Sequence, residues 1–389
     1  MFDRLLLFQH VCSPSNTPHT NWQASGFLYN SSSEQDDLMN DPATLQSHLE
    51  QWWKNSGTLG VTAAVRIDGR LYWQGASGFL SPDKKRALPV GGRFCIYSIT
   101  KSFTAVCLLR LQAHGALETT DSIKRWFPDL PLPDSISLAH LLRHTSGLRD
   151  YGPLREYHDA VKRSPSQPWT EEQFLNSVIP LGLLFEPGNG WAYSNIGFML
   201  LRNVIERVTG TSYRKCVEEQ IVKPLGLKNT FVAETIGDWA SCVPGYGKEV
   251  SASHEAIDVR GVYHPGWCAP GVMVSTTEEI TGFYDALFTG QLVDTEALKE
   301  ILTMVRLPGH HPPSVSPSSG MGIFGDPDGP WGAGYGHGGG GPGYNLDASI
   351  IPRFSRGRLV MAVFCNSSYG QSTQDAGRGL LNALLKGTL

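Results

Sequence analysis

Ser98 and Lys101 are the residues whose types and spacing first suggest chemistry. They lie three positions apart in Tyr97-Ser-Ile-Thr-Lys101, so on a helix both side chains project from one face and the ammonium can reach the hydroxyl. A serine hydroxyl is a weak nucleophile until a neighbouring base or cation activates it. A helix start adds free backbone N–H groups and the positive end of the helix dipole. The pair therefore predicts an activated nucleophilic serine.

The same spacing also arises by chance. The sequence holds three such matches, against about one expected from ordinary composition: Ser81/Lys84, Ser98/Lys101 and Ser212/Lys215. Ser81 precedes a proline in a charged turn, and Ser212 resembles the cap of an exposed helix. Only Ser98 stands at the head of an apolar helix, after the apolar run Phe94-Cys-Ile-Tyr97. Spacing alone does not make Ser98 catalytic, and further residues must support it.

Tyr193 and Asn195 form a second element, in Trp191-Ala-Tyr-Ser-Asn195. A tyrosine phenol has an ordinary pKa near 10. A nearby lysine cation would stabilise its phenolate and make it a plausible base for a serine proton. The alternative is structural: Tyr193 would be a core aromatic residue, and Asn195 would cap a helix that begins at residue 196. We expect the capping role in either case.

A glycine-rich tract surrounds His337, in Tyr335-Gly-His-Gly-Gly-Gly-Gly-Pro-Gly-Tyr344. Gly334, Gly336 and Gly339 formally match a dinucleotide-binding pattern, but no helical pattern follows and the segment leads into a strand. Glycine backbone beside a strand lets a substrate approach closely and offers an N–H to a developing oxyanion. The alternative is a flexible turn with an incidental histidine.

The remaining histidines and cysteines predict no metal centre. His144 resembles a structural histidine in a turn after a helix, and His310 and His311 lie in a proline-rich loop without a third ligand nearby. The seven cysteines are widely spaced and contain no C-x-x-C pair, which argues against a disulfide framework and a zinc site. We therefore expect neither a metal nor a cofactor.

Taken in order, Ser98-x-x-Lys101, Tyr193-x-Asn195 and His337-x-Gly339 resemble the motifs of the penicillin-recognising serine hydrolases. The most similar group includes class C β-lactamases, D-Ala-D-Ala carboxypeptidases, D-aminopeptidases, D-amino acid amidases and related esterases. The resemblance runs from about residue 42 to the C-terminus. Supporting stretches are Ile123-Lys-Arg-Trp-Phe-Pro-Asp129, Leu141-Leu-Arg-His-Thr-Ser-Gly-Leu148, Lys223-Pro-Leu-Gly-Leu227 and Gly271-Val-Met-Val-Ser-Thr276.

The resemblance implies a role for each motif residue. Ser98 would be the acylated nucleophile, with Lys101 holding its proton network. Tyr193 would act as general base and later activate the deacylating water, and Asn195 would hydrogen-bond Lys101 and the substrate amide. In the third motif, His337 would belong to the catalytic residues and Gly339 to the substrate-binding site. The backbone N–H groups of Ser98 and Gly340 would form the oxyanion hole.

The third motif departs from the β-lactamase pattern. β-Lactamases and most carboxypeptidases carry Lys-Thr/Ser-Gly there, and the lysine helps to hold the substrate carboxylate. Here the position is His337, which is mostly uncharged at neutral pH, and Gly338 removes the hydroxyl. His-x-Gly variants resemble the amidase, aminopeptidase and esterase branches, whose substrates need not present that carboxylate.

The elements that must position these residues predict an α+β fold (an α/β sandwich). Two β-rich runs around Asp68-Gly69 predict a hairpin, preceded by an amphipathic helix from Pro42 that carries Leu45, Leu49 and Trp52 on one face. Helical patterns cover 98–114, 137–144, 195–209, 212–222 and 376–386, and strands cover 346–351 and 359–364. These patterns predict an antiparallel sheet built from both chain ends, flanked by helices, with an inserted and mainly helical lobe.

The domain prediction follows from the distance between Ser98 and His337, which must share one site. Residues 42–389 would form a single two-lobed hydrolase domain. Its sheet lobe would cover about 42–97 and 271–389, and its helical lobe about 98–270. Residues 1–41 are rich in Ser, Asn, Asp and Gln and would form a mobile leader. The stretch 306–320 would be a long surface loop, and the glycine cluster at 332–343 would form a wall of the cleft.

Composition limits the partners of this 389-residue chain. Its 32 basic and 36 acidic residues give a formal net charge of −4, so no basic surplus favours nucleic acid or an anionic membrane. No apolar run approaches the roughly 18 residues of a membrane span. The N-terminus weakly resembles a signal core, but polar residues interrupt it and no cleavage site follows. We therefore expect a cytoplasmic protein.

The function predicted is a serine hydrolase that cleaves an amide or a small, D-amino acid-containing peptide through a Ser98 acyl-enzyme. The alternatives are a carboxylesterase or β-lactamase-like hydrolase at the same site, or an acyltransferase in which an amine or alcohol replaces water. A non-catalytic binding module on this fold is a third possibility, against which the intact set of motif residues argues. The expected partner is a small amide, peptide or ester substrate, and the oligomeric state stays open.

Overall fold

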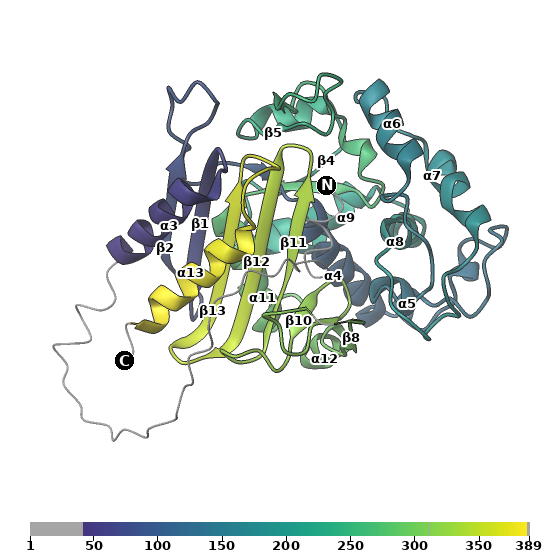
Figure 1. The fold of residues 1–389 in the computed structure, drawn as a ribbon. Helices are drawn as coiled ribbons and strands as arrows, with labels where there is room; N and C mark the ends of the chain where they lie inside the picture. The colour runs from purple at the N-terminus through teal and green to yellow at the C-terminus, as the bar shows by residue number, and fades with distance from the viewer. Residues whose placement is uncertain (1–41, 310, 387–389) are drawn as a thin grey trace.

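A central antiparallel sheet joins the two ends of the chain (Figure 1). The computed structural model describes residues 42–309 and 311–386. The predicted leader, residues 1–41, lies outside the described residues. Among the described residues the sheet has eight strands, in the spatial order β2 (Arg70–Gly78), β1 (Gly60–Ile67), β13 (Gly357–Cys365), β12 (Tyr344–Phe354), β11 (Gly334–Gly341), β10 (Phe324–Asp326), β9 (Ser318–Ser319) and β8 (Val305–Arg306).

The pairing of β1 with β13 joins the N-terminal hairpin to the C-terminal strands in one sheet. The register runs from Val61 opposite Cys365 to Ile67 opposite Leu359. Strands β1 and β2 form the predicted hairpin, and Asp68 and Gly69 at its turn have φ angles of 45° and 80°. A two-residue turn with both central φ values positive matches the twist of the flanking strands. The prediction of an α+β fold with an antiparallel sheet from both chain ends is therefore confirmed.

Helices cover both faces of the sheet (Figure 1). Helix α3 (Pro42–Ser56) and helix α13 (Thr373–Lys386) pack on one face, against alternate strand residues such as Val61 and Val363. Helix α11 (Thr277–Phe288) packs on the other face, where the intervening residues, such as Ala362 and Phe364, belong to the main core. Alternation of side chains along each strand gives two buried clusters, one on each face.

The middle of the chain is mainly helical and forms one side of the molecule (Figure 1). Its helices are α4 (Thr100–Ala113), α5 (Leu138–Leu142), α6 (Arg155–Arg163), α7 (Glu171–Val178), α8 (Asn195–Thr209), α9 (Tyr213–Val217) and α10 (Lys223–Leu225), and α12 (Thr295–Ile301) follows α11. Two smaller sheets accompany these helices. One consists of β3 (Phe94–Cys95), β7 (Val272–Ser275) and β4 (Phe231–Ala233), and the other of β5 (Tyr246–Gly247) and β6 (Ile257–Asp258).

The strongly periodic elements lie where the sequence predicts them. The predicted hairpin, the helix 195–209 and the C-terminal strands all form. Their observed bounds differ from the predicted bounds by no more than a few residues. The stretch predicted as helix 212–222 changes at Glu218 from α-helix to a π-helical turn. The division of residues 42–389 into a sheet lobe and a helical lobe stays a prediction.

Candidate active site

Ser98 lies in a sharp turn between a buried strand and a buried helix. Strand β3 pairs with β7, and the Ile96 N–H donates to Met273 O at 2.8 Å. A 3₁₀ turn over Tyr97–Ile99 then leads directly into α4. Tyr97 has a φ of 43°, a region that bulky residues rarely occupy and that tends to mark functional sites. Its buried hydroxyl donates to Pro342 O at 2.6 Å, which anchors the turn to the end of β11.

Lys101 follows Ser98 by one helical turn and is 2% exposed. Its Nζ lies 3.3 Å from Ser98 Oγ and donates to Asn195 Oδ1 at 2.8 Å. Burial lowers the pKa of Lys101 to about 7, although the nearby Asp150 carboxylate acts in the opposite direction. A lysine with this pKa is partly neutral near pH 7, so it can accept a proton as well as donate one.

Tyr193 contacts the same hydroxyl, and Lys101 Nζ lies 4.9 Å from the centroid of its ring. Its phenol donates to Ser98 Oγ at 2.8 Å. Burial raises the pKa of Tyr193 well above its usual value, and the hydrogen bond with Ser98 offsets only part of this effect. The phenol is therefore protonated at neutral pH. The structure thus brings the predicted residues Ser98, Lys101 and Tyr193 together, with the proton of the phenol directed at Ser98 Oγ.

Asn195 is the first residue of α8 and does not cap it. The cap is Ser194, whose Oγ accepts from the N–H of Gly197 at 3.2 Å. The prediction that Asn195 caps this helix is therefore wrong, because the adjacent serine takes that role. The Asn195 amide instead bridges two charged groups: its Oδ1 accepts from Lys101, and its Nδ2 donates to Asp150 Oδ2 at 3.0 Å.

Asp150 is a site residue that the sequence reasoning missed. Its Oδ1 also accepts from the Asn195 backbone N–H at 2.9 Å. Burial raises its pKa, while the Asn195 hydrogen bonds and the Lys101 charge act against this rise. The only sequence signal was indirect: a buried lysine needs a nearby opposite charge, but nothing marks which of the 36 acidic residues supplies it.

His144 supports the site from behind Tyr193, as a structural histidine. It is buried, and its Nδ1 accepts from the Ser194 N–H at 3.2 Å. The centroids of the His144 and Tyr193 rings are 4.4 Å apart. These contacts fix the segment that carries Tyr193, which confirms the interpretation of His144 as a hydrogen-bonded structural residue.

The glycine tract forms strand β11 itself rather than a turn before a strand. Strand β10 pairs with β11 only from Gly334 to Gly336. Beyond this point the edge of β11 lies against the Ser98 turn. A Cβ on Gly339 would collide with the Ile96 carbonyl, and one on Gly341 would collide with the Tyr97 ring. The glycines therefore allow a close approach that no larger residue permits.

Gly340 differs from its neighbours in this strand. A Cβ there would meet no atom within 4 Å, and Gly340 lines the same cavity as Ser98. The predicted oxyanion-hole residues Ser98 and Gly340 therefore line the same cavity. Gly339, the other glycine of the third motif, has its backbone packed against the Ser98 turn.

His337 is a neutral, buried histidine in the third motif. Its Nδ1 lies 2.6 Å from the carbonyl oxygen of Gly338, which can only accept, so Nδ1 carries the hydrogen and Nε2 the lone pair. Burial lowers the pKa of His337 to about 3, and the Lys101 charge adds to this effect. Within the described part of the chain, Nε2 is buried without a hydrogen-bond partner. The third motif thus presents an acceptor where a lysine would present a cation.

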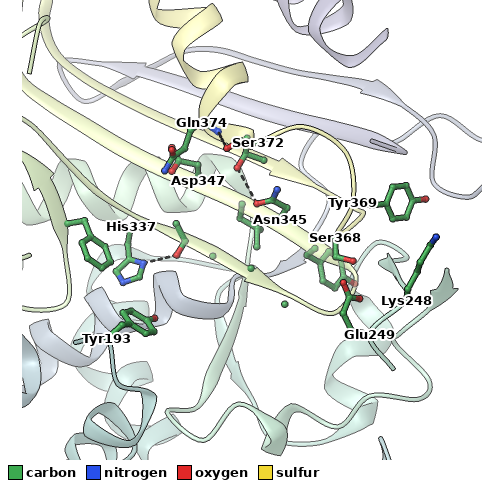
Figure 2. Close-up of a pocket in the computed structure, with 18 of the residues that line it drawn as sticks. Tyr193, Lys248, Glu249, His337, Asn345, Asp347, Ser368, Tyr369, Ser372 and Gln374 are labelled. Atoms are coloured by element: carbon green, nitrogen blue, oxygen red, sulfur yellow. Dashed lines mark hydrogen bonds between the residues drawn. The ribbon is translucent and has the colours of Figure 1, made fainter. Parts of the chain in front are cut away.

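Two adjoining cavities surround these groups. One of about 340 Å³ contains Ser98, Lys101, Asn195 and Gly340. Its walls are rich in aromatic rings: Tyr97, Tyr151, Tyr157, Trp191, Tyr193, Tyr263, Trp267 and Phe324. The other, of about 530 Å³, shares Tyr193 and Gly340 with it and runs along β11 past His337 (Figure 2).

Residues 42–309 and 311–386 show no candidate metal centre. These residues contain no group of three or more His, Cys, Asp or Glu side chains placed to hold a metal ion. His310 lies outside the described residues, and His311 Nε2 lies 2.7 Å from Pro308 O. In the same part of the chain, no helix is both long enough and apolar enough to cross a membrane.

A serine, a lysine, a tyrosine and an asparagine are joined in this way at the edge of an antiparallel sheet, an arrangement of the kind that serine-dependent acyl transfer uses. The family model described as "Beta-lactamase" matches residues 45–385. The chain belongs to this family.

Two solved structures cover most of the chain. A D-stereospecific amidohydrolase from Streptomyces sp. is 31% identical, with a TM-score of 0.75 over 90% of this chain and 100% of that one. A D-amino acid amidase from Ochrobactrum anthropi SV3 is 25% identical, with a TM-score of 0.76 over 89% and 99%.

The curated relatives are matched over part of their length. Penicillin-binding protein 4* of Bacillus subtilis (strain 168) is 28% identical over 280 residues, which are 67% of this chain and 60% of that protein. Esterase EstB of Burkholderia gladioli is 29% identical over 48% of this chain and 50% of its own length. The chain thus spans between half and two thirds of these relatives.

Proposed function

We propose that this protein is a serine hydrolase that cleaves an amide bond through an acyl-enzyme on Ser98. One observation carries the proposal: Ser98 Oγ is contacted both by Lys101 Nζ at 3.3 Å and by Tyr193 OH at 2.8 Å. A base and a proton donor that both contact the hydroxyl are what a serine needs to attack an amide and release an amine.

The pKa directions assign the first proton transfer to Lys101. The sequence prediction gave the role of base to Tyr193, but burial keeps that phenol protonated. The neutral Lys101 amine takes the proton of Ser98 as Oγ bonds to the substrate carbonyl carbon. The oxyanion accepts hydrogen bonds from the backbone N–H groups of Ser98 and Gly340. Asn195 and Asp150 stabilise the lysine ammonium formed in this step.

Collapse of the tetrahedral intermediate breaks the C–N bond. An amine leaves only when its nitrogen is protonated, and the Tyr193 phenol is placed to supply that proton. Lys101 then returns its proton to Tyr193. In deacylation Lys101 and Tyr193 carry protons in the reverse direction. Water loses a proton as its oxygen bonds to the acyl carbon, and Ser98 Oγ regains a proton as it leaves that carbon. Atoms and charges balance without a cofactor.

Amide cleavage is favoured over the other reactions of this site for two reasons. The cavity offers His337 as a neutral acceptor in place of the lysine cation that the substrate carboxylate of a β-lactamase needs. The structural neighbours include a D-stereospecific amidohydrolase and a D-amino acid amidase. Both observations support small amino acid amides or D-amino acid-containing peptides as substrates.

The test is a substrate panel with wild type and Ser98→Ala. The panel contains D- and L-amino acid amides, p-nitrophenyl esters, nitrocefin, and an added amine acceptor. We expect amide hydrolysis by wild type, no turnover by Ser98→Ala, and loss of fluorophosphonate labelling in that variant. Turnover of nitrocefin or esters alone would overturn the amide assignment, and acyl transfer to the amine in preference to water would make the protein an acyltransferase. Labelling that survives in Ser98→Ala would overturn the nucleophile.

A further inference from the structure

Glu249 lies where the two cavities meet and is not used by the catalytic residues. It lines both cavities, and it belongs to the loop between β5 and β6. Figure 2 shows Glu249 and His337 at opposite ends of the larger cavity, with β11 between them. A half-buried carboxylate at this place faces whatever occupies the site.

One carboxylate oxygen of Glu249 has no partner. Among the described residues, Oε2 is buried and accepts no hydrogen bond. A buried charged acceptor left unpaired costs more free energy than a neutral one, so such groups are usually paired. The carboxylate is also close enough to Tyr97, next to the nucleophile, to help raise the pKa of that phenol. Within the described residues the Glu249 carboxylate also forms no ion pair, so a cationic ligand group in the cavities that it lines would supply its counter-charge.

The charges of the smaller cavity indicate a cationic ligand group. Among its described lining residues, the charged side chains are Lys101, Asp150 and Glu249, since the nearby His158 has a lowered pKa. Lys101 and Asp150 are joined through the Asn195 amide. Glu249 is therefore the charged side chain of this cavity that stays available to pair with a ligand, and its charge is negative. The surrounding aromatic rings also favour a cation and an apolar substrate side chain.

The direction of β11 places the two ends of the substrate. With the carbonyl at Ser98 and its oxygen at Gly340, one side of the substrate extends toward His337 and the other toward Gly341 and Glu249. The unpartnered Nε2 of His337 suits the N–H of a leaving amide. The acyl side, with its α-substituents, then lies at the Glu249 end.

We propose that Glu249 binds the α-ammonium group of the substrate, so that the enzyme acts on amino acid amides and peptides with a free amino terminus. This inference rests on the proposed function and narrows its substrate class. N-acylated amides, which lack the positive charge, would bind without this ion pair.

The experiment compares phenylalanine p-nitroanilide, as separate D and L enantiomers, with its N-acetyl derivative. Wild type should favour the free amine of the preferred enantiomer. Glu249→Gln should raise KM for that substrate by about ten- to hundred-fold, the range for a hydrogen bond between charged groups, with kcat little changed. Turnover of the N-acetyl derivative should be unaffected. Glu255→Gln, which alters an exposed acid of the same loop outside both cavities, should behave as wild type.

Several results would overturn the inference: a wild-type preference for the N-acetyl derivative, equal losses on both substrates in Glu249→Gln, or no change on either. Fluorophosphonate labelling of Ser98 separates this failure from failure of the proposed function, because the reagent carries no ammonium group. Glu249→Gln should be labelled at the wild-type rate, which also shows that it folds. A wild-type protein that is not labelled at Ser98 would instead refute the proposed function. Glu249→Asp, which keeps the charge on a shorter side chain, should recover part of the preference.

Discussion

At the scale of single residues, burial shifts the pKa values of two side chains in the candidate site in opposite directions. Burial lowers the pKa of Lys101 to about 7 and raises that of Tyr193. Both shifts favour the uncharged forms of the two side chains, which are the forms that the proposed mechanism needs. Pairs of titratable groups separated in this way are typical of sites that do acid–base chemistry at neutral pH.

This assignment predicts the pH dependence of acylation. Because the neutral amine of Lys101 is the base, kcat/KM should rise with pH and level off above about pH 7. His337, with a pKa of about 3, is already neutral in this range. The substrate should be p-nitrophenyl acetate, which has no amine of its own to titrate. Lys101→Arg, which cannot lose its proton, should lower kcat/KM by about 10²- to 10⁴-fold. A rate that falls as pH rises through 7 would contradict the role of Lys101.

The sequence could predict the reacting residues but not all of their partners. The spacing of Ser98 and Lys101 recurs by chance in this sequence, but its combination in order with the motifs at Tyr193 and His337 could be found without a structure. Asp150 could not, because its role depends on burial beside Asn195 and not on its neighbours in sequence. Asn195 was misread as a cap because Ser194, one residue earlier, is an equally good one.

At the scale of elements, strand β11 and the Ser98 turn act as one unit. The strand ends in four consecutive glycines, 338–341. Of these, Gly339 lies against the backbone of the Ser98 turn and Gly341 against its Tyr97 ring. The spacing between the N–H groups of Ser98 and Gly340, the proposed oxyanion hole, depends on this contact. The glycines are therefore required for close packing rather than for flexibility.

Two alanine substitutions in β11 test this interpretation. Gly339→Ala would drive a Cβ into the Ile96 carbonyl, which is backbone and cannot move aside. The strand must shift, so we expect a loss of about 10²- to 10³-fold in kcat, comparable to the loss of an oxyanion donor. Gly338→Ala is the control, because its Cβ would make only ordinary contacts with Leu346 and Asp347, at 3.6 and 3.9 Å. Equal activity in the two variants would refute the packing role.

The form of β11 shows why an element can be harder to predict than a residue. Helix α8 and the strands β12 and β13 were located from their sequence patterns. A run of glycines has no side chains and hence no periodicity, so the sequence could indicate a cleft wall but not a strand. The strand forms because β12 pairs with it along its length.

At the scale of the whole molecule, helices α3 and α13 stabilise the face of the sheet that lies away from the Ser98 site. Helices α3 and α13 bury one cluster with the outer face of β1 and β13. The other face of the sheet packs against the main core, which contains Tyr97 and leads to the catalytic turn. Damage to the first cluster should therefore affect stability more than chemistry.

Leu380→Ala tests this separation. Leu380 is 1% exposed in the α3–α13 cluster, and its truncation should lower the free energy of unfolding by about 2–5 kcal/mol. Below the unfolding transition kcat should stay near the wild-type value. Asn382→Ala, an exposed position of the same helix, should leave both quantities unchanged. Denaturant unfolding followed by tryptophan fluorescence measures the first quantity, and a parallel loss of kcat in the folded Leu380→Ala protein would contradict the separation.

The central claim is that turnover passes through an ester on Ser98, and trapping that ester tests it most directly. Wild type is mixed with the preferred amino acid amide, quenched in acid within the first turnovers, and its intact mass and peptides are measured. The account predicts an added mass equal to the acyl group, located on the peptide that contains Ser98 and absent from Ser98→Ala. Steady turnover with no acyl group on Ser98, or with the acyl group on another residue, would contradict it.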